Sequence, residues 1–230
     1  MYAMVVSRPD IAYTVGALAR HVQNPQKEHW NAVWHLLRYL NTTKALGITY
    51  QGISTSGPKD IEVIGMSDSD WAGNRETRRS TSSYVFTLNG AAITWSSRLQ
   101  KTVALSSMEA EYMGGCAAAK EAVWIRQILA DSSIFLLGEN TESEKLPTTP
   151  IYMDNQAAIS LSKNPDFREK AKHIEIQYHY LRQQVERDII SITYLPTTEM
   201  TADIMTKGLN RILHQKHVAG MGMRGASRGD

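Results

Sequence analysis

Short apolar runs alternate with longer amphipathic stretches along this chain, and the alternation predicts an α/β domain. The apolar and β-rich runs predict strands over residues 61–67, 84–88, 91–95, 151–153 and 189–194. Apolar residues that recur at three- or four-residue steps predict helices over residues 8–23, 26–43, 106–130, 155–163, 168–187 and 198–207. This order of strands and helices is typical of a mixed sheet flanked by helices.

Asn89-Gly90 lies between two of the predicted strands. An Asn-Gly pair between β-rich runs indicates a hairpin with a tight turn. The first three strands are therefore expected to form an antiparallel meander.

Polar segments predict the domain boundaries. Residues 51–60, which carry Gly and Pro, predict a linker between a helical segment (1–50) and the main domain (61–209). Residues 131–149 lose periodicity and predict a loop inside that domain. Residues 210–230 predict a C-terminal tail, frayed in its last ten residues because these are rich in Gly, Arg and Ser.

The composition excludes several classes of protein. Hydrophobic residues make up 42% and charged residues 21% of the 230-residue chain, as in ordinary globular domains. The net charge of +2 does not by itself indicate a nucleic-acid binder, and one cysteine rules out an internal disulfide. The apolar start is interrupted by Arg8-Pro9, so neither a signal peptide nor a membrane span of about 18 apolar residues is expected.

Two carboxylates are predicted at strand ends. Asp68 follows the apolar run of the first strand, and Asp154 follows the strand over 151–153. Asp70 competes with Asp68, and we prefer Asp68 because it is nearer the apolar run. Asp203, inside the last predicted helix, is a weaker candidate because an acid on a helix is usually solvated.

The helix over 106–130 carries a fourth candidate, Glu111. Ser106 and Glu109 fit a capping box, which gives Glu109 a structural role. At about 100° per residue, Glu111 falls in an apolar stripe, whereas Glu109 and Cys116 face the other way. A carboxylate in such a stripe is costly unless it has a partner.

These four acids predict a divalent metal site. Magnesium takes oxygen ligands, and two such ions about 4 Å apart can activate a water and stabilise the leaving oxygen of a phosphodiester. The interpretation that follows from the residues is a site that cleaves a nucleic-acid backbone.

Several motifs, in order, resemble the ribonuclease H domain of copia-type LTR retrotransposon Pol polyproteins. They are SDSDWAG (67–73), RRSTSSYVF (78–86), ITWSSRLQKTVALSSMEAEY (93–112), YMDNQAA (152–158), KHIEIQYHYLR (172–182) and YLPTTEMTADIMTKGL (194–209). Residues 7–50 resemble the stretch that joins the reverse transcriptase to that domain. The chain therefore looks like a C-terminal piece of a polyprotein.

The resemblance implies a ribonuclease H fold with a five-stranded mixed sheet and helices on both faces. It implies endonucleolytic cleavage of RNA in an RNA–DNA hybrid with two Mg²⁺ ions, Mn²⁺ being an alternative. Its catalytic and metal-binding acids fall on Asp68, Glu111, Asp154 and Asp203. The implied partner is the reverse transcriptase portion of the polyprotein. The resemblance implies no binding to a membrane and no small-molecule cofactor. The implied location is a cytoplasmic virus-like particle or the nucleus, and the protein is not expected to be secreted.

Two features depart from the wider family. Residues 196–202 hold no histidine, which many cellular ribonucleases H carry before the last helix. The chain has no YxDD motif, so it has no polymerase active site.

Basic and hydroxyl residues near the strand connections are candidates for contact with the phosphates of the hybrid. The candidate residues are Arg78, Arg79, Ser82, Arg98, Lys101, Ser106, Ser107 and Asn155. The alternative is that the charges are ordinary solvated loop charges. Trp71, Trp95 and Trp124 can stack on bases, but packed aromatics are more common.

A second function class remains open. The chain can keep the fold yet act only as a catalytically silent tether that binds nucleic acid or positions a polymerase. The four acids favour the nuclease. A transposase or integrase is disfavoured, because the AEY and TADIMTK motifs resemble the ribonuclease branch.

Overall fold

The structure is a computed structural model that describes residues 1–50, 62–132, 146–163 and 175–225. The predicted linker over 51–60 lies outside the described residues, as do most of the predicted loop over 131–149 and the beginning of the predicted helix over 168–187. Within the described part, no helix is long and apolar enough to cross a membrane.

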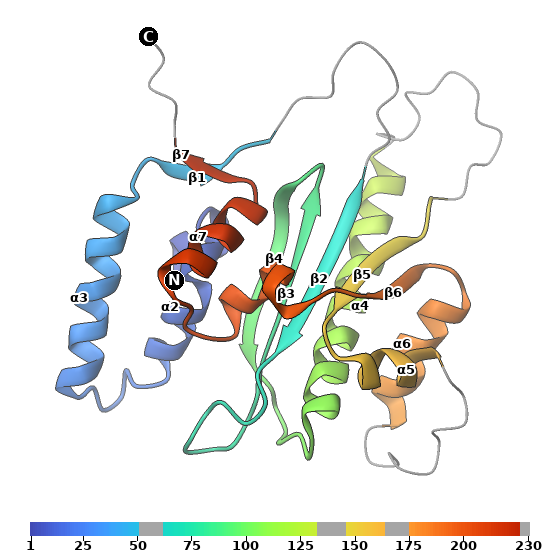
Figure 1. Ribbon diagram of the computed structural model, residues 1–230, viewed down its shortest axis with the longest axis horizontal. Helices are drawn as coiled ribbons and strands as arrows, with labels where there is room; N and C mark the ends of the chain where they lie inside the picture. The colour runs from blue at the N-terminus through green and yellow to red at the C-terminus, as the bar shows by residue number, and fades with distance from the viewer. Residues whose placement is uncertain (51–61, 133–145, 164–174, 226–230) are drawn as a thin grey trace, which may run out of the picture.

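A five-stranded mixed sheet forms the centre of the fold (Figure 1), and its strand order is β4-β3-β2-β5-β6. The strands are β2 (Val63–Ser69), β3 (Thr81–Leu88), β4 (Ala91–Leu99), β5 (Thr149–Met153) and β6 (Ile190–Tyr194). The first three strands are antiparallel, whereas β5 is parallel to β2 and β6 to β5. The expected mixed sheet is confirmed. The strand β2 runs two residues further than predicted, so Asp68 lies inside it rather than after it.

The turn between β3 and β4 has both Asn89 (φ 49°) and Gly90 (φ 82°) in the left-handed region. Two-residue hairpin turns need this conformation at both central positions, and Asn and Gly tolerate it. The hairpin expected from the Asn-Gly pair is confirmed.

One face of the sheet is covered by α4 (Ser107–Asp131), α5 (Gln156–Lys163) and α6 (Glu175–Glu186). Ser106 caps α4 by accepting a hydrogen bond from the Glu109 N–H at 3.1 Å, as predicted. The prediction that Glu109 and Cys116 face away from the core is wrong, since both are buried. The helix α4 is covered by the sheet on one side and by α6 on another, so more than one of its faces is enclosed.

The other face is covered by η6 (Thr201–Met205), α7 (Arg211–Gly220) and α2 (Ala12–Ala19). The predicted helix over 198–207 is instead two short 3₁₀ helices, η5 (Thr197–Glu199) and η6. All five residues of η6 are buried, whereas an amphipathic α-helix on a surface would expose one side. Hydroxyls of the sheet hold η6 in place: Ser83 donates to the Ala202 carbonyl at 3.0 Å, and Ser97 donates to the Met205 carbonyl at 2.6 Å.

The N-terminal segment contributes α1 (Tyr2–Val6), η1 (Pro9–Ile11), α2, α3 (Lys27–Thr42) and β1 (Leu46–Ile48). The helix predicted over 8–23 is therefore shorter and begins as a 3₁₀ turn. The indole N–H of Trp95 on β4 donates to the Met4 carbonyl at 2.7 Å, which fastens this segment to the sheet. Trp30 and Trp34 on α3 remain 58% and 51% exposed, so part of the apolar stripe of this helix lies on the surface.

Two short strands outside the central sheet form a second, two-stranded sheet. The strand β1 pairs antiparallel with β7 (Met223–Gly225), so Ile48 lies opposite Met223. Residues 211–225 of the expected tail thus form a helix and a strand that pack on the rest of the protein (Figure 1).

Candidate metal centre and nucleic-acid interface

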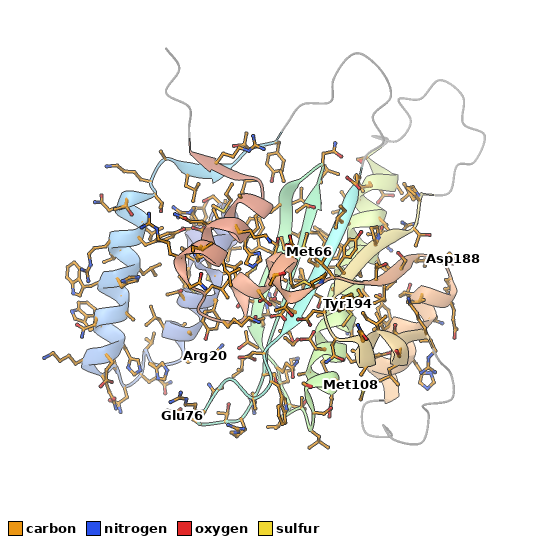
Figure 2. The ribbon with its side chains drawn as sticks, in the orientation of Figure 1. Arg20, Met66, Glu76, Met108, Asp188 and Tyr194 are labelled. Atoms are coloured by element: carbon orange, nitrogen blue, oxygen red, sulfur yellow. The ribbon has the colours of Figure 1, made fainter. Side chains whose placement is uncertain are left out.

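Three aspartates meet where β2, β5 and η6 come together. The parallel pairing of Met66 with Tyr152 places Asp68 and Asp154 two residues further along neighbouring strands, on the sheet face that η6 covers (Met66 is labelled in Figure 2). Asp203 comes from η6 itself. Among the described residues, one carboxylate oxygen from each of the three lies within 4.8 Å of the other two.

Asp68 is buried at the centre of this cluster, with 2% of its surface exposed. The hydroxyl of Thr206 donates a hydrogen bond to its Oδ2. Burial and then the charge of Asp203 raise the pKa of Asp68 from 3.8 to about 7, against the opposing effect of Lys207 and the Thr206 hydroxyl.

Glu111 approaches from the opposite face of the sheet, because α4 carries it. Its Oε1 accepts a hydrogen bond from the Ser69 N–H at 3.1 Å, and its buried Oε2 has no partner among the described residues. Burial, followed by the charges of Asp68 and Asp154, raises the pKa of Glu111 to about 9. Glu111 therefore borders the three-aspartate cluster but is not part of the group whose oxygens lie within 4.8 Å.

Lys207 supplies positive charge to the cluster. Its Nζ lies 2.9 Å from Asp203 Oδ2, while the buried Oδ1 of Asp203 has no partner among the described residues. Burial lowers the pKa of Lys207, but Asp68, Asp203 and Asp154 together raise it by more, so the ammonium form is favoured. Asp154, which is less buried, accepts a hydrogen bond from the Thr197 hydroxyl at 2.6 Å.

The chemistry of this cluster fits a hard divalent cation. Among the described residues, several carboxylates converge with too little positive charge to balance them, and two of their buried oxygens lack hydrogen-bond donors. Magnesium binds oxygen ligands of this kind. Burial and then like-charge repulsion raise the pKa of Asp68 and Glu111, and a bound cation would offset the repulsion.

Asp70, the alternative to Asp68, points elsewhere. It is the residue after β2, and its carboxylate accepts a hydrogen bond from the Thr81 N–H across the start of β3. Burial raises the pKa of Asp70. The structure places this carboxylate outside the three-aspartate cluster.

The expected phosphate-binding residues fall into two groups. Arg78, Arg79, Arg98, Lys101 and Ser107 are exposed and free to meet a ligand. The other three side chains already have structural partners: Ser82 accepts from Ser69 at 2.9 Å and from Gln100 at 2.7 Å, Ser106 caps α4, and Asn155 accepts from the Ala158 N–H at 3.0 Å.

The indole rings are not all packed in the core. Trp71 and Trp124 are 54% and 50% exposed, and Trp71 donates to the Ala104 carbonyl at 3.1 Å. Trp95 is more buried and packs against the η6 face of the sheet. Stacking on a base therefore remains sterically open at Trp71 and Trp124.

Sequence reasoning missed three residues of the site: Thr197, Thr206 and Lys207. Each contacts one of the aspartates, and each lies within seven residues of Asp203. The i,i+4 spacing of Asp203 and Lys207 is a signal for an ion pair on a helix. Nothing in the spacing points to the contacts that Thr197 and Thr206 make with distant strands.

Comparisons with known proteins find similar sequences in transposon polyproteins. It is 39% identical over 92% of its length to the retrovirus-related Pol polyprotein from transposon TNT 1-94 of Nicotiana tabacum, of which it covers 15%. It is 35% identical over 92% of its length to the corresponding polyprotein from transposon RE2 of Arabidopsis thaliana, of which it covers 14%. The chain thus spans about one seventh of the length of these curated relatives.

A shorter relative has a different name. A secreted RxLR effector protein of Plasmopara viticola is 47% identical over 125 residues, which are 54% of this chain and 84% of that protein. Among solved structures, a ribonuclease H1 isolated from compost by a metagenomic approach aligns with 63% of this chain and 92% of its own, at 15% identity and a TM-score of 0.46. No protein-family profile matches the chain.

Proposed function

We propose that this chain, which belongs to the family of retrovirus-related Pol polyproteins from transposons, is a copia-type ribonuclease H that hydrolyses the RNA strand of RNA–DNA hybrids. The observation that carries the proposal is the cluster of Asp68, Asp154 and Asp203, whose carboxylate oxygens lie within 4.8 Å of one another. A mixed sheet with helices on both faces supports it.

The four acids are the proposed ligands of the cations. Asp68, Asp154 and Asp203 would bind divalent magnesium, with Glu111 as a further ligand from the α4 side. When bound, two magnesium ions supply Lewis-acid stabilisation of the attacking and leaving oxygens of a phosphodiester. Manganese, which accepts the same oxygen ligands, is the alternative cofactor.

The neighbours of the acids fix their positions. The Ser69 N–H holds Glu111, the Thr197 hydroxyl holds Asp154, and the Thr206 hydroxyl holds Asp68. Hydrogen bonds of this kind orient metal-binding carboxylates before the cation arrives.

The exposed basic residues near the sheet provide contacts for the hybrid. Arg78, Arg79, Arg98 and Lys101 would bind its phosphates. If Arg78 and Arg79 do so, replacing both with Ala should flatten the dependence of hybrid affinity on salt, since each lost phosphate contact reduces counterion release. An unchanged slope would leave them as solvated loop charges.

The relatives give the proposed setting of the reaction. In a retrotransposon polyprotein the domain would work beside the reverse transcriptase portion and remove RNA from newly made hybrids. The proposed location is a cytoplasmic particle, with the nucleus as an alternative.

The test is cleavage of an end-labelled RNA–DNA hybrid with Mg²⁺, compared with Asp68→Asn and Asp154→Asn variants. Duplex DNA and duplex RNA of the same sequence serve as control substrates. We expect the parent protein to cut only the RNA of the hybrid, and both variants to spare it. A folded parent that binds hybrid without cutting it would refute the nuclease and support the silent tether.

A further inference from the structure

A groove of about 700 Å³ lies next to the carboxylate cluster, between the N-terminal segment and the stretch that follows η6. One wall comes from η1, α2 and α3, and the other from residues 204–215. A volume of this size is typical of ligand sites. None of the residues expected from the sequence to bind phosphate lines this groove.

The groove and the carboxylate cluster share Lys207. This residue lines the groove, and its ammonium lies 2.9 Å from Asp203 in the cluster. Ile204, the neighbour of Asp203, also lines the groove. The groove therefore borders the cluster at Ile204 and Lys207.

The charge of the groove favours an anion. Lys207 and Arg211 line it, and Arg211 is exposed. Among the described residues that line the groove, Asp10 is the one acid, and it is already neutralised, because Arg8 forms an ion pair with it at 2.7 Å and the Tyr39 hydroxyl donates to it at 2.6 Å. Lys207 is held by Asp203 in the cluster, so Arg211 is the cation through which the groove attracts an anion.

The remaining polar walls carry hydroxyl groups and rings rather than charges. Tyr13, Thr14 and Thr42 bring hydroxyls, and His35 brings an imidazole. Hydroxyls and aromatic rings, together with Arg and Lys, are the groups that contact phosphates and sugars in nucleic-acid complexes. An elongated polyanion suits this lining better than a compact apolar ligand does.

We infer that this groove binds the sugar–phosphate backbone of a nucleic-acid strand that extends from the carboxylate cluster, with Arg211 contacting a phosphate. The inference rests on the proposed function, which brings a hybrid to the cluster. It adds a binding surface that the N-terminal segment builds together with residues 204–215. The N-terminal segment is then part of the substrate site and more than a covering of the sheet.

The experiment measures the affinity of the full chain for a fluorescently labelled RNA–DNA hybrid by anisotropy, over a series of KCl concentrations and with EDTA to prevent cleavage. Arg211→Gln is compared with Arg38→Gln, a matched control on α3 whose exposed side chain lies outside the groove. Loss of one phosphate contact lowers the slope of log affinity against log salt by about 0.7–0.9. We expect that decrease for Arg211→Gln, no decrease for Arg38→Gln, and a slope restored by Arg211→Lys.

Hybrids with a single-stranded RNA or DNA overhang identify the bound strand. An overhang that enters the groove raises the affinity of the parent, and Arg211→Gln loses that increase. An equal slope in the parent and Arg211→Gln, with the hybrid still cleaved in Mg²⁺, would overturn the groove and leave the nuclease standing. A changed slope without cleavage would keep the groove and refute the nuclease, and a parent that binds no hybrid would overturn both.

Discussion

Replacement of Asp68 by Asn should stabilise the metal-free protein even though it destroys the proposed active site. Asp68 is buried beside Asp203, and these surroundings raise its pKa from 3.8 to about 7. Ionising the carboxyl at pH 8 therefore raises the free energy of the folded state relative to that of the unfolded state. Asn has nearly the same shape and carries no charge, so it avoids this cost.

The magnitude follows from the size of the pKa shift. Each pKa unit corresponds to about 1.4 kcal/mol, so a rise of roughly three units sets an upper bound of about 4 kcal/mol. The amide of Asn needs hydrogen-bond partners of its own, which offsets about 1–2 kcal/mol of this gain. We expect Asp68→Asn to raise the free energy of unfolding by about 2 kcal/mol at pH 8.

The raised pKa of Asp68 also predicts how the stability of the parent protein changes with pH. Below a pH of about 4, Asp68 is protonated in both states, and the carboxyl costs nothing. Between pH 4 and about 7, the folded state keeps a proton that the unfolded state has lost, so the stability of the parent falls as the pH rises. Between pH 7 and about 9 the difference should grow further, because burial and then the charge of Asp68 raise the pKa of Glu111 to about 9, and Asn removes that charge.

The assay is urea unfolding followed by tryptophan fluorescence at pH 4.5, 6 and 8, with EDTA present. A parallel series with Mg²⁺ should stabilise the parent, by about 2.7 kcal/mol when the cation is at 100 times its Kd, and should stabilise the variant much less. A variant that is less stable than the parent at pH 8, or a difference that does not change with pH, would refute the electrostatic reasoning.

Three further substitutions test other parts of the structure. Lys207→Gln removes the cation next to Asp203. The variant should bind Mg²⁺ several-fold more tightly in calorimetric titration, because the repulsion between the ammonium of Lys207 and the metal ion is lost. Weaker binding would show that Lys207 organises the site instead. Gly114→Ala should destabilise the protein by about 1–3 kcal/mol in thermal unfolding, because the Cβ of the new alanine would lie 2.5 Å from the Ser69 hydroxyl oxygen. A stabilised variant would mean that the higher helix propensity of alanine outweighs this contact. Ser106→Ala removes the cap of α4 and should cost about 1 kcal/mol in urea unfolding, whereas an unchanged midpoint would show that the cap is dispensable.

The sequence by itself determined the features that local physics controls. The β-rich runs and the Asn89-Gly90 pair specified the hairpin, because side-chain periodicity and left-handed turn residues act over a few positions. The cap of α4 at Ser106 followed from its local pattern in the same way. Asp154 could be named from the strand that it follows, and Asp68 from the apolar run that it follows, although Asp68 lies inside β2.

The tertiary structure decided what depends on contacts between distant segments. Residues 201–205 form a 3₁₀ helix rather than an α-helix, and all of them are buried against the sheet and α7. The pairing of β1 with β7 and the groove between the N-terminal segment and residues 204–215 arise between segments that are far apart in sequence. The hydrogen bond from Thr206 to Asp68 joins positions 138 residues apart, so no local pattern can reveal it. This packing determines which acids face one another and how strongly their charges repel.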